Sequence, residues 1–191
     1  MKKYVCIGQP KTGTKTIAKI FNLLNFKVNS NPLCLERNTD FILLDNNISY
    51  YTNDSISKCH NNIEIFEAFH DYPYSFNYEY INNNFPDSIF ILTTRDNDEW
   101  FNSFFKYQYL ENSTNKNLLK KLYGYEFFLL ENKEKVIEKY IEYNLNIIKY
   151  FNDNPSKLLI IDLTKNNIKK ELSDFLKINI DFEIPHENKG I

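Results

Sequence analysis

Short apolar runs alternate with segments of helical periodicity along the chain. The apolar runs are rich in β-branched and aromatic residues and lie between turn-forming residues, which is typical of buried strands. Five strands are predicted on this basis, at residues 4–8, 41–44, 63–66, 88–94 and 158–161.

The segments between these runs carry apolar residues three and four positions apart, which indicates helices with one buried face. Asp96 is a suitable N-cap for one of them, because aromatic residues from Trp100 to Phe105 then lie on one side. The predicted helices are 14–25, one that begins after Asp96, 118–151 with a break near Gly124 or Asn132, and 168–176.

The alternation of strands and helices predicts an α/β fold. Strands that are apolar on both faces belong in a parallel sheet that is covered by helices on each side. No linker rich in proline, glycine or serine divides the chain, and no internal repeat is visible. We expect one domain over residues 1–191, with a central parallel sheet flanked by helices.

Composition and charge narrow the class of protein. The 191 residues include 42% hydrophobic ones, enough for a sizeable core, and the net charge is −2. This balance gives no electrostatic reason to expect a nucleic acid or a membrane as a partner. No run approaches the roughly 18 apolar residues that span a bilayer. We expect a cytoplasmic protein.

The cysteines point the same way. Cys6, Cys34 and Cys59 are an odd and sparse set, which argues against a disulfide scaffold and suits a reducing compartment. No Cys-x-x-Cys pair and no closely spaced pair of histidines is present to start a zinc site. We expect no bound metal.

The strongest chemical signal is the turn between the first strand and the first helix. Residues 8–16 read Gly-Gln-Pro-Lys-Thr-Gly-Thr-Lys-Thr, in a chain with only four glycines. A glycine-bearing loop at a helix start directs backbone N–H groups at an anion, and the helix dipole favours negative charge there. The sequence therefore predicts a P-loop-like phosphate site rather than an ordinary turn with solvated lysines.

The loop is a near miss for a Walker A motif. Four residues separate Gly8 from Gly13, but the lysine arrives one position late, at Lys15. On a helix, a shift of one residue turns a side chain by about 100°. A P-loop kinase that uses Lys15 for the phosphates remains an alternative.

Another pattern fits better, because Pro-Lys-Thr-Gly-Thr at residues 10–14 resembles the phosphate loop of the sulfotransferases. The resemblance implies that the loop binds the 5′ end of 3′-phosphoadenosine 5′-phosphosulfate (PAPS), with Lys11 at the bridging oxygen and the transferring sulfonate. The implied 5′-phosphate contacts are Thr12, Gly13, Thr14, Lys15 and Thr16. Family members usually have Thr or Ser where Lys15 stands, and many cytosolic ones have an adenine-stacking Trp where Thr16 stands.

A second segment resembles the 3′-phosphate motif of the same family. A strand ends at Arg95, and Ser103 follows eight residues later on the next helix. An arginine offers a bidentate fork to a phosphate, and a hydroxyl two turns along the helix can share that phosphate. For Arg95 alone, a surface ion pair with Asp96 or Asp98 is the alternative.

Two further stretches extend the resemblance. Residues 185–190, Pro-His-Glu-Asn-Lys-Gly, are similar to a C-terminal segment of family members that folds over the 3′-phosphate, which implies a role for Lys189. Residues 69–73 and 85–88 look like a region of a compact sulfotransferase branch, with Tyr72 in place of Trp. Residues of about 26–62 and 107–156 carry no recognisable motif.

Sulfonate transfer also needs a group that accepts the proton of the acceptor. The resemblance places that base at Asp71, with His70 as second choice because histidine titrates near neutral pH. If residues 65–69 form a strand, adjacent side chains need not share a face, so only one of the two would face the substrate. For Asp71, a turn residue before residues 72–73 is the alternative.

The resemblance thus implies a PAPS-dependent sulfotransferase with a small-molecule or glycan acceptor that presents a hydroxyl or an amine, and no required metal. Tyr72, Tyr74, Tyr107 and Tyr109 are candidates to line the acceptor pocket. Two alternatives stay open. One is a kinase in which Asp45 or Asp162, each after an apolar strand, holds Mg²⁺; the other is a non-catalytic nucleotide-binding module.

Overall fold

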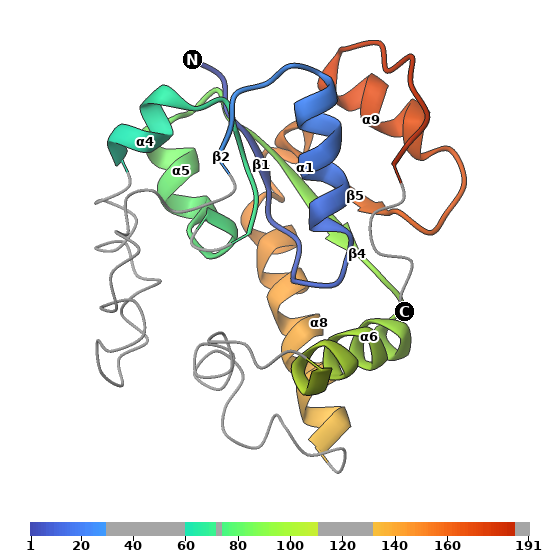
Figure 1. Ribbon diagram of the computed structural model, residues 1–191. Helices are drawn as coiled ribbons and strands as arrows, with labels where there is room; N and C mark the ends of the chain where they lie inside the picture. The colour runs from blue at the N-terminus through green and yellow to red at the C-terminus, as the bar shows by residue number, and fades with distance from the viewer. Residues whose placement is uncertain (30–59, 72–73, 111–131, 186–191) are drawn as a thin grey trace.

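A computed structural model describes residues 1–29, 60–71, 74–110 and 132–185 of the chain (Figure 1). Its strands form one parallel sheet in the order β2-β3-β1-β4-β5. The strands are β1 (Tyr4–Cys6), β2 (Val28–Asn29), β3 (Ala68–Phe69), β4 (Ile89–Thr94) and β5 (Leu158–Asp162). The predicted α/β architecture is confirmed.

Helices cover both faces of this sheet (Figure 1). One face packs against α1 (Thr14–Leu23) and α9 (Ile168–Leu176). The elements that pack against the other face are α4 (His60–Ile65), the 3₁₀ turn η2 (Tyr74–Phe76), α5 (Tyr78–Asn84) and α8 (Lys133–Tyr150). The remaining described elements are α6 (Asn97–Leu110), which packs on α8, and the 3₁₀ turn η5 (Pro155–Lys157).

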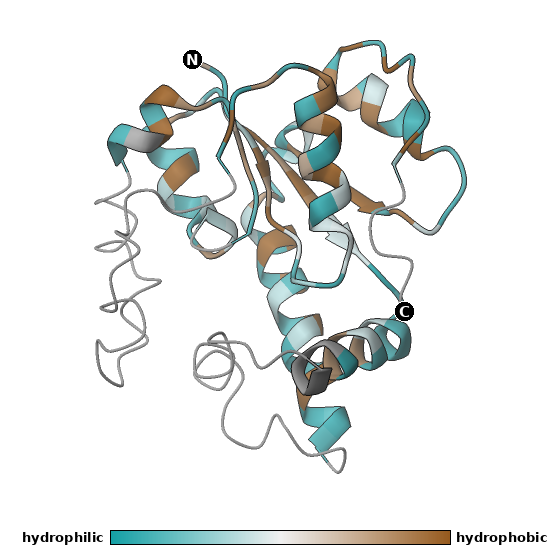
Figure 2. Ribbon diagram, viewed as in Figure 1, coloured by the Kyte–Doolittle hydropathy of each residue, from teal (hydrophilic) through white to brown (hydrophobic). Residues whose placement is uncertain are grey.

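The side chains of each strand point alternately to the two faces of the sheet, which divides the core of the sheet into two clusters. Along β4, Phe90 and Leu92 point to the α8 face, whereas Ile89 and Ile91 point to the α1 and α9 face. Successive side chains of a strand alternate between faces, so a strand covered on both sides is apolar throughout. Figure 2 shows this as brown central strands, with more hydrophilic colours where β4 ends and in the loop after β1.

Helix α8 joins this core to α6. Ile147, near its C-terminal end, packs under the sheet, whereas Val136 and Tyr140 pack against Trp100 and Phe104 of α6. This third apolar cluster holds α6 at the end of β4 from which it emerges. The packing of α6 on α8 therefore sets where the residues after β4 lie.

Most strongly patterned elements are confirmed. The structure contains the predicted first strand and first helix, the strands at 88–94 and 158–161, and the helices after Asp96 and at 168–176. The predicted break near Asn132 matches the start of α8, whose N-cap is Asn132. The predicted strand at 41–44, Gly124 and the rest of segment 118–131 lie outside the described residues.

The predicted strand at 63–66 is wrong. Residues 63–65 form the end of helix α4, Phe66 follows the helix, and the strand β3 begins at Ala68. The apolar residues of this segment suggested a buried strand, but Ile65 is 51% exposed. The ammonium of Lys3 donates to the carbonyl oxygen of Glu64 in the last turn of α4 (3.0 Å) and to that of Phe66 just after the helix (2.8 Å), and so binds carbonyl groups that a helix end leaves without an intrahelical partner.

The strand order determines which loops meet. β1 lies between β3 and β4, so the carboxyl ends of these three strands are neighbours at one edge of the sheet. Adjacent strands lie about 4.8 Å apart. After β1 the chain moves toward β2, whereas after β4 it moves toward β5, and open α/β sheets bind ligands at such a reversal.

One further feature concerns membranes. Over residues 1–29, 60–71, 74–110 and 132–185, no helix combines the length and apolarity needed to cross a bilayer.

Candidate functional site

The loop between β1 and α1 is built around two glycines. A Cβ on Gly8 would lie 2.7 Å from the carbonyl oxygen of Thr93 and 2.8 Å from the hydroxyl of Thr12, so only glycine fits there. Gly13, the N-cap of α1, has φ +100°, which favours glycine, and a Cβ there would lie 2.6 Å from Leu163. The two glycines thus let the loop lie against β4 and β5.

The first turn of α1 is free of side-chain capping. Gly13 has no side chain, and the Thr16 N–H donates to the Gly13 carbonyl oxygen at 2.9 Å. The first N–H groups of an α-helix, here those of Thr14 and Lys15, have no acceptor within the helix. Backbone amides and the positive end of the dipole at a helix start favour an anion, so the predicted phosphate site at this turn stays a prediction.

The loop threonines Thr12, Thr14 and Thr16 are buried. Thr12 donates its hydroxyl proton to the Gln9 carbonyl oxygen (2.6 Å), lies 2.6 Å from the Thr93 hydroxyl, and directs its N–H at Gln9 as well. Both of its donors therefore shape the loop. Thr16 is also buried, at 6% exposure. A phosphate contact by either residue stays a prediction.

The two loop lysines have different settings. Lys11 is half-buried and has φ +73°, a left-handed conformation that costs a non-glycine residue about 1–2 kcal/mol. Lys15 is exposed in the first turn of α1, and its charge acts on Asp71. Backbone strain at a loop lysine is the kind of outlier that occurs at ligand sites.

His70 and Asp71 follow β3 and contact each other. His70 Nδ1 lies 3.0 Å from Asp71 Oδ2, and Thr14 donates its hydroxyl proton to Asp71 Oδ1 at 3.1 Å. The pair therefore joins the end of β3 to the start of α1. The expectation that only one of the two faces the substrate is refined by exposure: the side chain of Asp71 is 33% exposed, that of His70 only 7%.

The environment of Asp71 keeps its carboxylate ionised. Burial alone would raise the pKa of Asp71, but the hydrogen bond from His70, the charge of His70, the Thr14 hydroxyl and the charge of Lys15 together hold it below its ordinary value. With Asp71 ionised, His70 Nδ1 acts as the donor between them. Asp71 is also a turn residue, as the alternative interpretation held, because its φ is +60° and its carbonyl oxygen accepts from Ser75.

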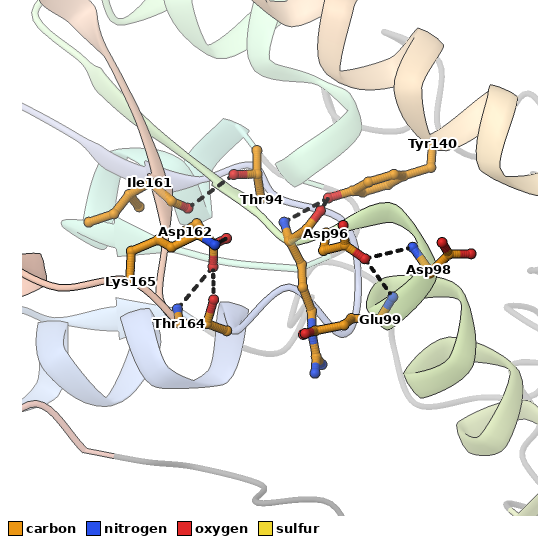
Figure 3. Close-up of polar contacts among 10 residues, drawn as sticks. Thr94, Asp96, Asp98, Glu99, Tyr140, Ile161, Asp162, Thr164 and Lys165 are labelled. Atoms are coloured by element: carbon orange, nitrogen blue, oxygen red, sulfur yellow. Dashed lines mark hydrogen bonds and ion pairs between the residues drawn. The ribbon is translucent and has the colours of Figure 1, made fainter.

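Arg95 directly follows β4, and its side chain forms an ion pair with Glu99. Its Nε donates to Glu99 Oε2 at 3.1 Å, one helical turn on, with 30% and 58% of the two side chains exposed. The alternative partners Asp96 and Asp98 are wrong. Asp96 caps α6 by accepting from the N–H groups of Asp98 (3.0 Å) and Glu99 (3.1 Å), as Figure 3 shows, while Asp98 pairs with Lys133.

The other predicted residues are placed as follows. Ser103 is half-buried on α6, two turns beyond Arg95. Lys189, Tyr72 and the side chains of Tyr107 and Tyr109 lie outside what the structure describes. Tyr74 is fully buried beside Phe69, with ring centroids 4.8 Å apart.

Asp162 is the last residue of β5, the position at which the kinase alternative places a ligand of Mg²⁺. Its Oδ1 accepts from the N–H (2.9 Å) and the hydroxyl (2.7 Å) of Thr164, and its Oδ2 lies 3.8 Å from Lys165 (Figure 3). This carboxylate shapes the turn after β5. No group of three His, Cys, Asp or Glu side chains with metal-binding geometry occurs in the described parts of the chain. Asp45, the other metal ligand that the kinase alternative offers, lies outside the described residues.

Several residues that the motifs did not single out support the site. Thr93 lies behind the loop, and Tyr140 contacts the main chain of Arg95. Trp100 and Tyr140 belong to helices that the apolar periodicity of the sequence predicted. The spacing of apolar residues along a helix does not indicate, however, which loop a buried indole or phenol contacts. Only the packing of α6 on α8 assigns these contacts.

The comparison with protein families agrees with this geometry. The family described as the sulfotransferase domain matches the chain over residues 3–190, nearly its whole length. The chain therefore belongs to the sulfotransferase family. No curated protein matches it in sequence. Membership supports sulfonate transfer as its general activity.

The lowered pKa of Asp71 predicts that wild type and an Asp71 variant differ in stability by an amount that depends on pH. Because its pKa is lower in the folded state, ionised Asp71 stabilises the fold above the unfolded-state value of about 3.9, and this contribution is lost as pH falls through the folded pKa. Asn tolerates the left-handed φ of this position. We expect Asp71→Asn to unfold at lower urea concentration than wild type at pH 7, with the gap closing below about pH 4.

Asp87→Asn is the control, because it removes a carboxylate elsewhere on the surface. A gap for Asp71→Asn that is constant from pH 7 to pH 3.5, or equal to that of the control, would contradict the assigned cause.

Proposed function

We propose that the protein transfers a sulfonate group from PAPS to a hydroxyl or an amine of an acceptor. One observation carries the proposal: the anion-binding turn after β1 and the arginine after β4 lie at adjacent carboxyl ends of the same sheet. One molecule with phosphates at both ends of an adenosine can reach both places. Two phosphate sites on opposite edges would have excluded this.

The residues at the two ends suit such a ligand. The first-turn amides of α1, Lys11 and Lys15 supply donors and positive charge for the 5′ end. Arg95 keeps its two Nη groups for a phosphate while its Nε donates to Glu99. Ser103 on α6 and Lys189 belong to the same 3′ end in this proposal. Buried Thr16 offers no stacking surface, so adenine contacts come from other residues.

The chain's own contribution is alignment and charge. When bound, PAPS supplies the sulfonate, and adenosine 3′,5′-bisphosphate is the leaving group. Lys11 is placed to neutralise charge that develops on the leaving phosphate, which is the main task of a protein in such group transfers. Its strained backbone is part of the loop that holds it there.

Asp71 is the proposed proton acceptor, with His70 as its supporting partner. Asp71 is the more exposed of the two, is ionised, and is fixed by Thr14 at the start of the helix that binds the 5′ end. Buried His70 holds the other carboxylate oxygen. In this proposal the acceptor is a small molecule or a glycan, and neither a nucleic acid nor a membrane is a partner.

Nucleotide binding tests the two-ended site. We expect adenosine 3′,5′-bisphosphate to raise the Tm without Mg²⁺ and to bind more tightly than 5′-AMP in calorimetry. Arg95→Ala is expected to weaken the bisphosphate roughly ten- to hundredfold, the value of a few charge-assisted hydrogen bonds, and to leave 5′-AMP unchanged. Lys133→Ala, which removes a cation beside Asp98 on the same side, is the matched control and should change neither affinity.

Two results would overturn the proposal. If Arg95→Ala loses affinity for both nucleotides equally, Arg95 does not contact a 3′-phosphate. Stronger stabilisation by Mg-ATP than by the bisphosphate would favour the kinase with Lys15 and Asp162 in the phosphate and metal roles.

Variants of Lys11 test sulfonate transfer separately from nucleotide binding. We expect Lys11→Ala to lower the transfer rate roughly 10²-fold or more while the bisphosphate affinity falls much less, because its charge matters most as the leaving group develops. Lys11→Gly relieves the left-handed strain, so it should show the same loss with a Tm no lower than that of Lys11→Ala. Measurements of kcat and of Kd separate the two effects.

Equal losses of binding and rate would remove Lys11 from the catalytic role. Bisphosphate binding by the wild type with no sulfonate transfer to any of a wide panel of acceptors would identify a non-catalytic nucleotide-binding module.

Asp71 tests the proton acceptor. We expect Asp71→Asn to lower kcat roughly 10²- to 10⁴-fold without weakening the bisphosphate, because the variant keeps the shape but cannot take a proton. His70→Gln should reduce kcat less. The reverse order of the two variants would assign the proton to His70.

A further inference from the structure

A continuous set of contacts joins the phosphate loop to Arg95 through α6 and α8. The indole N–H of Trp100 donates to the Pro10 carbonyl oxygen at 2.9 Å. The Trp100 ring stacks on Tyr140, with centroids 4.1 Å apart and planes 11° apart. The Tyr140 hydroxyl accepts from the Arg95 N–H (3.0 Å) and donates to the Arg95 carbonyl oxygen (3.3 Å).

These contacts end on main-chain atoms of the two segments that the proposed function assigns to the two phosphates. A hydrogen bond to a carbonyl oxygen or an N–H fixes the backbone, whatever the side chain does. Pro10 directly precedes Lys11 in the loop, and Arg95 directly follows β4. The stack therefore acts on the positions of the two segments relative to each other.

Rigidity and burial suit the two aromatic residues for this task. Trp100 is fully buried and Tyr140 is 1% exposed. Aromatic side chains have few rotatable bonds, and offset-stacked pairs add about 0.5–1.5 kcal/mol to area burial. Burial raises the pKa of Tyr140, so its hydroxyl keeps the proton that it donates to Arg95.

Simple core packing would not require these polar ends. A phenylalanine at either position would fill much of the same apolar space between α6 and α8. Tyr150, nearly three turns further along α8, shows the contrast. Its hydroxyl contacts Asn82 (3.1 Å) and Asn83 (3.5 Å) near the end of α5, and neither belongs to the loop or to the segment after β4. Tyr150 is thus a matched tyrosine on the same helix.

We propose that Trp100 and Tyr140 are positioning residues that set the separation between the loop and Arg95, and thereby the preference for a nucleotide phosphorylated at both its 5′ and 3′ positions. The inference rests on the proposed function, because it takes the loop and Arg95 as the two phosphate sites. Neither residue contacts the nucleotide. Each acts through the backbone of a segment that does.

The two residues are expected to act on different ends of the ligand. Tyr140→Phe keeps the stacked ring and removes the hydroxyl, which contacts the Arg95 main chain and the side chain of Asn144 on α8 itself. Trp100→Phe keeps an aromatic ring and removes the hydrogen bond to the loop. The first change therefore loosens the 3′ end, and the second loosens the 5′ end.

The experiment measures Kd for adenosine 3′,5′-bisphosphate and for 5′-AMP by calorimetry in the full chain. We expect Tyr140→Phe to reduce the preference for the bisphosphate roughly five- to tenfold, the effect of about one hydrogen bond, with 5′-AMP binding unchanged. Trp100→Phe should weaken both nucleotides by a similar factor and keep their ratio. Tyr150→Phe is the control and should change neither value.

The outcomes separate the two proposals. A wild type that does not prefer the bisphosphate overturns the proposed function, and this inference with it. A wild type that does prefer it, with the full preference retained in Tyr140→Phe, overturns the positioning role alone. Circular dichroism verifies folding; if Tyr140→Phe does not fold, unchanged binding of both nucleotides by folded Trp100→Phe still overturns the inference.

Discussion

The site depends on the parallel pairing of β1 between β3 and β4. In a parallel sheet all strands point the same way, so the residues after three neighbouring strands meet at one edge whatever their separation in the sequence. This places the loop at Gly8, the carboxylate of Asp71 and the guanidinium of Arg95 within a few strand spacings of one another. Every chemical role assigned to these residues follows from that arrangement.

Charge at this edge is arranged around a single helix start. The dipole of α1 and the lysines at 11 and 15 favour an anion, and the nearby carboxylate of Asp71 is balanced by His70, Thr14 and Lys15. On the other side of β1, Glu99 offsets Arg95. In the proposed function, the positive side of this edge binds phosphate and the ionised carboxylate of Asp71 takes the proton.

The predictions that held are those in which local chemistry and packing agree. Asp96 was identified as a helix cap because its side chain can accept from the first-turn amides, and it does. The run at 88–94 is apolar on both faces, and β4 is covered on both faces. The strand predicted at 63–66 is wrong because three of its residues form the end of α4, where Ile65 is exposed. Lys3, 61 residues away from Glu64 in the sequence, binds the Glu64 carbonyl oxygen there.

By itself, the sequence determined the elements with strong periodicity, the glycine-bearing loop, the arginine after a strand and the family to which they belong, because each is a local pattern of residue types. Tertiary structure alone decided that Thr12 contacts Thr93 and that Asp71 bonds to Thr14. It also decided that Trp100 and Tyr140 reach two different loops. Such contacts depend on how distant segments pack in three dimensions. No periodicity along the chain encodes which partner a buried polar atom finds.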